Sequence, residues 1–72
     1  MHAESYAHAH RECLRARIAA KRALTHLSEV LSLGRADDLN PLRKFAQRSA
    51  EQAVRTYRTA LNKRNYEIRQ LS

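Results

Sequence analysis

Histidine and cysteine are the residues of this sequence that could bind a metal or act as a nucleophile, and several lie near the N-terminus. His8 and His10 are two residues apart, and Cys13 follows. On a helix, residues two apart point about 200° away from each other, so these two rings cannot hold one ion. A single thiol among alanines behaves as a small hydrophobe unless a base activates it. We therefore expect no metal, no cofactor and no enzyme activity.

Basic residues dominate the charge of the chain. Fourteen Lys and Arg residues against seven Asp and Glu residues give a net charge of +7. Six of them form rows at helical spacing, here called the basic ridges: Arg11, Arg15 and Arg22 in the first half, and Lys44, Arg48 and Arg55 in the second. Such rows could follow a phosphate backbone, and Tyr66 could stack on an unpaired base. They could also be solvated helix faces or contacts for an acidic protein.

One cluster of helix-breaking residues divides the chain into two similar halves. The sequence contains one Gly and one Pro, and both lie within residues 34–41. Gly34 suits the C-terminal cap of a helix, and Asn40 followed by Pro41 suits a helix start. The sequence predicts an all-α fold, a single antiparallel helical hairpin over residues 1–72. We expect a first helix at about 3–33, a turn at 34–40 and a second helix at about 41–71.

Each predicted helix carries one apolar stripe that should face the other helix and form the hairpin seam. The first stripe is Tyr6, Ala9, Cys13, Ala16, Ala20, Ala23, Leu27 and Val30, widened by Leu24 and Leu31. The second is Leu42, Ala46, Ala50, Ala53, Val54, Tyr57, Ala60, Leu61, Ile68 and Leu71, interrupted by Arg64. Alanine lets the helices approach closely but leaves little apolar area to bury, so a lone hairpin is marginally stable. We expect a homodimer, a homotetramer or a partner protein to complete the core.

A second apolar strip lies on the N-terminal half of the first helix and is called the N-terminal strip here. It consists of Ala3, Ala7, Leu14 and Ile18. At about 100° per residue, this strip is rotated well over 90° from the seam stripe. The second helix cannot cover both faces. The N-terminal strip is therefore the predicted surface for a partner protein.

The sequence also bears on where the chain would work. No apolar run approaches the length of a membrane span, so we expect no membrane partner. The N-terminus carries His and Glu where a signal peptide would have a basic region and an apolar run. These features predict a cytoplasmic protein.

Three segments resemble the small co-chaperones of bacterial type III secretion needle subunits, which are single helical hairpins of similar length. They are Ala19-Ala20-Lys21-Arg22-Ala23-Leu24, Asn40-Pro41, and Ala50-Glu51-Gln52-Ala53 followed by Tyr57. The resemblance extends over nearly the whole chain. It implies a protein that pairs with a second, larger helical-repeat chaperone and helps keep the needle subunit from polymerising in the cytosol. This chain departs from the pattern in being so basic.

The architecture also resembles the plasmid copy-number regulators that dimerise as helical hairpins and grip paired RNA loops. The net charge fits this alternative, a dimeric nucleic-acid-binding regulator. The N-terminal strip favours a protein partner instead, because a phosphate-binding surface would present base-edge or stacking groups. The sequence thus predicts a binding module, with a chaperone role ranked ahead of RNA binding.

Overall fold

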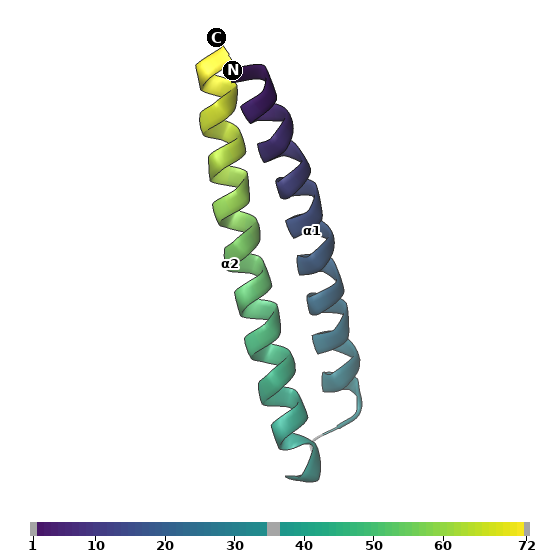
Figure 1. The fold of residues 1–72 in the computed structure, drawn as a ribbon. Helices are drawn as coiled ribbons and strands as arrows, with labels where there is room; N and C mark the ends of the chain where they lie inside the picture. The colour runs from purple at the N-terminus through teal and green to yellow at the C-terminus, as the bar shows by residue number, and fades with distance from the viewer. Residues whose placement is uncertain (1, 35–36, 72) are drawn as a thin grey trace.

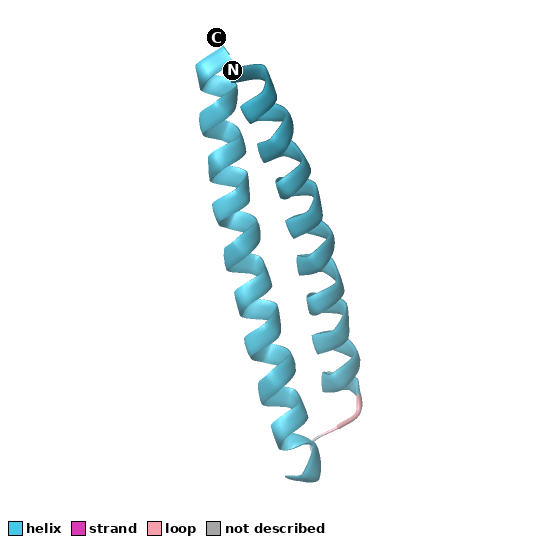
Figure 2. Ribbon diagram, viewed as in Figure 1, coloured by secondary structure: helices cyan, strands magenta, loops and turns pink. Residues whose placement is uncertain are grey.

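The computed structural model describes residues 2–34 and 37–71 and shows two long antiparallel helices side by side (Figure 1). Helix α1 spans His2–Ser32, the short 3₁₀ helix η1 spans Asp37–Leu39, and α2 spans Asn40–Leu71. The described residues contain no strand (Figure 2). The Cα atoms extend 53 Å along the hairpin and 13 Å in each other direction. The all-α hairpin predicted from the sequence is confirmed.

The end of α1 follows from the backbone freedom of its glycine. Leu33 N donates to Val30 O at 3.1 Å, and Gly34 N donates to Leu31 O at 3.4 Å. Gly34 has a φ of +100°, a conformation that residues with a side chain rarely adopt. The helix therefore ends where the glycine predicts, one residue before the expected boundary at 33.

The last part of the predicted turn at 34–40 is helical. Residues 37–39 form η1, which leads directly into α2 at Asn40. A short 3₁₀ turn is common at a helix N-terminus because its hydrogen bonds tighten the first turn. Arg43 Nη1 donates to Gly34 O at 2.8 Å and so ties α2 back to the end of α1. Arg35 and Ala36, also part of the predicted turn, lie outside the described residues.

Small residues form the seam between the helices. The buried apolar residues among those described are Ala9, Cys13, Ala16, Ala20 and Val30 of α1, and Ala46 and Ala50 of α2. The predicted seam residues Tyr6, Ala23, Leu27, Ala53, Tyr57 and Leu61 are half-buried. Val30 is the largest buried side chain in this set. Close packing of alanines thus holds the axes together while burying few methylene groups.

The apolar stripes are wider than the seam that forms. Leu42, Ile68 and Leu71 belong to the predicted stripe of the second helix, but they are exposed. Leu24 and Leu31, on the flank of the other stripe, are also exposed. A single neighbouring helix covers only the centre of a stripe that spans 100° or more. The assignment of Leu42, Ile68 and Leu71 to a covered stripe is therefore wrong.

Candidate protein-binding surface

Large apolar side chains lie on the outside of the hairpin. Ten of them in the described residues are 39–64% exposed: Leu14, Ile18, Leu24, Leu31, Leu33, Leu42, Phe45, Tyr66, Ile68 and Leu71. Isolated exposed leucines are ordinary, but an apolar surface gathered in a groove indicates an interaction site. The fold brings two of these ten side chains, Leu24 and Leu31, into one groove.

A groove of about 840 Å³ lies between the helices near the turn and gathers three leucines of α1. We call it the leucine groove. Its apolar lining consists of Leu24, Leu27 and Leu31 of α1 with Ala50 and Val54 of α2. Its polar lining comes entirely from α2: Asn40, Arg43, Lys44, Gln47, Glu51, Arg55 and Arg58. One wall is thus apolar, and the other is mostly basic.

Hydrogen bonds support the polar wall of the leucine groove. The bond from Arg43 to Gly34 O fixes the guanidinium at the turn end of the groove. Gln47 Nε2 donates to Glu51 Oε1 at 3.4 Å, one helical turn apart. Glu51 is the only acidic residue in the lining, against four basic residues. The wall therefore carries a positive field that a bound acidic group would neutralise.

A second hollow, of about 450 Å³, lies elsewhere between the helices and has a different character. Its lining is His8 and Glu12 of α1 with Gln52, Arg55, Thr56, Thr59, Ala60 and Lys63 of α2. Thr56 Oγ1 already donates to Gln52 O at 3.0 Å, and Arg15 Nη1 lies 3.5 Å from Glu12 Oε1. Ala60 is its single apolar side chain, so this hollow offers little apolar area to a partner.

The N-terminal strip is separate from the leucine groove, because none of its four residues lines the groove. Ala3 is exposed, Ala7 is half-buried, and Leu14 and Ile18 are 42% and 51% exposed. At about 100° per residue, Leu14 lies roughly 80° around α1 from Leu24, and Ile18 roughly 120°. Both point further from α2 than the groove does. The partner-binding role of this strip stays a prediction.

The leucine groove is the site that sequence reasoning missed. The sequence pattern contains Leu24 and Leu31, but their spacing indicated only a wider seam stripe. Only the paired helices show that these leucines stay outside the seam and meet the Lys44–Arg58 stretch of α2.

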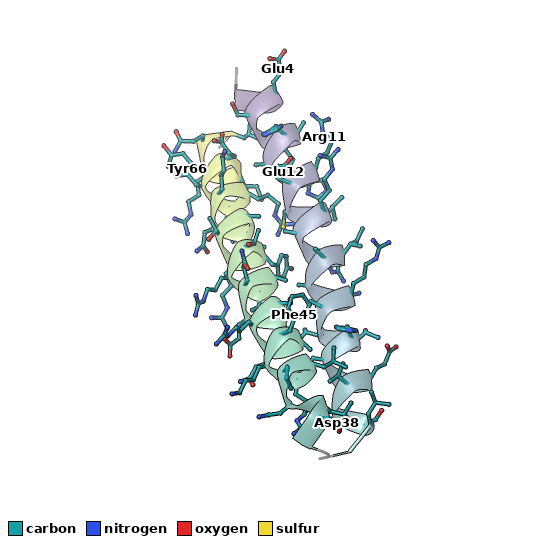
Figure 3. The ribbon with its side chains drawn as sticks, turned by 60° about the horizontal axis from the view of Figure 1, so that its bottom comes forward. Glu4, Arg11, Glu12, Asp38, Phe45 and Tyr66 are labelled. Atoms are coloured by element: carbon teal, nitrogen blue, oxygen red, sulfur yellow. The ribbon has the colours of Figure 1, made fainter. Side chains whose placement is uncertain are left out.

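The basic ridges do not form one surface. All six residues, Arg11, Arg15, Arg22, Lys44, Arg48 and Arg55, are exposed. Arg11 is two residues from buried Ala9, so the first ridge points away from α2, whereas Lys44 and Arg55 of the second ridge line the leucine groove beside Leu24 and Leu31 of α1. In Figure 3, Arg11 projects from α1 and Tyr66 from α2 on opposite outer sides of the hairpin. The two ridges thus lie on different parts of the surface, and part of the second ridge belongs to the leucine groove.

His10 and Cys13 occupy structural positions, whereas His8 and His26 are exposed. The rings of Tyr6 and His10 stack, with centroids 5.8 Å apart and an interplanar angle of 21°. Cys13 is 2% exposed, so solvent barely reaches its thiol. Within residues 2–34 and 37–71, no three His, Cys, Asp or Glu side chains gather closely enough to hold a metal ion.

The described helices are amphipathic along their length. Neither has a stretch apolar enough and long enough to cross a membrane, as judged over the described residues. Their exposed apolar side chains are instead interspersed with Arg and Lys, as in the leucine groove. Comparison of the chain with protein-family models, with curated proteins and with solved structures finds no match in any of the three.

Proposed function

We propose that this protein is a non-enzymatic, protein-binding hairpin that acts as a small accessory chaperone. In this role it helps keep a type III secretion needle subunit soluble in the bacterial cytoplasm, together with a second chaperone. One observation carries the binding role: alanines fill the seam while ten large apolar side chains of the described residues are 39–64% exposed. The resemblance of the three segments to needle co-chaperones is the basis for proposing a needle subunit as the partner.

The mechanism is mutual burial of apolar surface. The hairpin covers an apolar face of its partner, and the partner covers the exposed side chains of the hairpin. Because each protein binds its partner only in the folded state, binding stabilises both folded proteins by mass action. Each partner then remains soluble, because the complex competes with aggregation and with premature assembly.

A double substitution in the N-terminal strip tests this proposal. Leu14→Ser with Ile18→Ser should leave helix content unchanged, because both side chains lie outside the seam. Recovery of the cellular partner should fall about tenfold or more, because truncation of buried anchors dominates interface energetics. Quantitative mass spectrometry of proteins captured on the tagged chain measures this, and the proposal expects a secretion subunit or its second chaperone among them.

The matched control removes apolar side chains from other exposed positions. Leu33→Ser with Phe45→Ser takes away residues that are 61% and 64% exposed, and it should keep the partner. Retention of every partner by the Leu14/Ile18 variant would show that the N-terminal strip is not the binding surface.

The exposed basic ridges and the net charge of +7 favour RNA binding as a second candidate. If phosphate contact is the function, Arg48→Ala with Arg55→Ala should reduce the salt dependence of binding by a slope of about 2. We expect instead weak binding that does not distinguish sequences, because the two ridges do not form one continuous basic surface. Fluorescence anisotropy with structured and scrambled RNA over a salt series measures both quantities. Sub-micromolar binding to one RNA at physiological salt, with scrambled RNA rejected, would put this candidate first.

A further inference from the structure

We infer that the leucine groove binds an acidic amphipathic α-helix of a partner protein. This inference goes beyond the proposed function. The proposed function depends on exposed apolar surface in general, and the experiment that tests it changes the N-terminal strip. It assigns a second, separate site and states the chemistry of its occupant. It stands on the shape of the groove and on the charge of its wall.

The shape of the groove suits a helix. The lining residues of α2 run from Asn40 to Arg58, which corresponds to about 27 Å of helix axis. Leu24, Leu27 and Leu31 run antiparallel to them over about 10 Å of α1, so the apolar wall extends along about two turns of the groove. An amphipathic helix binds such a groove by inserting apolar residues spaced at i, i+3, i+4 and i+7. About 18 residues of partner helix would span the α2 wall, with about two of its turns against the leucines.

The apolar side chains of the groove are partly uncovered. Leu24 and Leu31 are 48% and 57% exposed, and Leu27 and Val54 are half-buried beneath them. A third helix laid here would cover the flank of the α1 stripe that α2 leaves open. Burial of these side chains supplies the affinity, since apolar area removed from water stabilises the complex.

The positive charge of the groove wall favours a partner helix with negative charge. Lys44, Arg55 and Arg58 are exposed along the α2 wall, and none of them has an acidic partner among the described residues. Glu51 is occupied by the bond from Gln47. A helix with Glu or Asp beside its apolar residues would pair with these cations, whereas a basic helix would be repelled.

The same charge argues against a second copy of this chain as the occupant. Each copy carries a net charge of +7, and its own exposed faces present the basic ridges. Two such surfaces brought together in the groove would place like charges opposite each other, which is costly at an interface. A partner of opposite charge avoids this cost.

Two designed peptides provide the probe. Each is an 18-residue, fluorescently labelled helix with Leu at i, i+3, i+4 and i+7 spacing, and the remaining positions are Ala with Glu in one peptide or Lys in the other. The full-length protein should bind the Glu peptide at least about tenfold more tightly than the Lys peptide at low salt, and the difference should shrink as salt rises. Anisotropy titration measures both affinities.

Two pairs of substitutions locate the site. Lys44→Glu with Arg58→Glu should weaken binding of the Glu peptide at least about tenfold and favour the Lys peptide. Arg11→Glu with Arg22→Glu makes the same change of net charge on the outer face of α1 and should alter affinity less than about threefold. An equal effect of both pairs would overturn the inference, because the attraction would then be general.

Apolar variants separate this site from the N-terminal strip. Leu24→Ser with Leu31→Ser should abolish binding of the Glu peptide, while Leu14→Ser with Ile18→Ser should keep it. Helix content by circular dichroism confirms that each variant is folded. No binding of the Glu peptide, or its loss only in the Leu14/Ile18 variant, would overturn the groove site without touching the proposed function. A change in the sedimentation mass of the protein alone on Leu24/Leu31 substitution would identify a second copy as the occupant and would also overturn it.

Discussion

Replacing Ala20 with Arg is expected to unfold the hairpin, whereas the same replacement at Ala19 is expected to leave it folded. Ala20 is 5% exposed in the seam, and Ala19 is exposed to solvent. Overpacking a seam costs about 1–3 kcal/mol, and a desolvated guanidinium adds to that cost. A change at an exposed site is worth about 0.5 kcal/mol or less. Circular dichroism and urea titration of both variants measure the difference.

Comparison of Ala20→Arg with Ala19→Arg isolates the effect of burial, because the same substitution is made at two adjacent positions. The two variants have the same composition, the same net charge and nearly the same helix propensity. Partner binding should fall together with helix content in Ala20→Arg and should persist in Ala19→Arg. Equal stability of the two variants would mean that α1 is rotated about its axis relative to the fold described here.

The second large expected effect is a low stability of the isolated chain. Without its partner, the protein is expected to melt near ambient temperature as a monomer, or to exist as a dimer or tetramer. The buried seam consists of alanines, Cys13 and Val30, which supply little apolar area for a chain of 72 residues. His10 Nδ1 and Arg64 Nε are buried without a hydrogen-bond partner among the described residues, and each such group costs about 1–3 kcal/mol.

Light scattering and thermal circular dichroism on the purified protein measure both quantities. Partner at about 100 times its Kd should add about 2.7 kcal/mol of stability, which raises the Tm by roughly 10–20 °C for a domain of this size. A monodisperse monomer that melts above about 65 °C would contradict the prediction that the hairpin core is incomplete.

The sequence determined the hairpin because the signals for it are local. Gly34 can adopt a positive φ and end one helix, and Asn40 with Pro41 can begin the next, whatever the rest of the chain does. The seam is equally local in origin. Residues such as Ala9 and Ala46 face inward because the spacing of apolar residues fixes their angle on their own helix.

The packing of the two helices determines how much of each apolar stripe is covered and which side chains of the other helix lie beside that stripe. A pattern on one helix does not specify where the axis of its neighbour lies or which flank remains open. Leu24 and Leu31 therefore looked like seam residues, yet they line a groove, and Leu42 is exposed although its spacing matches the stripe.

The positions of the basic residues relative to the opposite helix also depend on how the two helices pack. Spacing aligned Arg11 with Arg22 and Lys44 with Arg55 on their own helices. The antiparallel packing brought Lys44, Arg55 and Arg58 to the groove wall opposite Leu24 and left Arg11 on the outer side of α1 (Figure 3). Relative rotation of two helices is set by the contacts between them, so the basic wall opposite the leucines became visible only in the paired helices.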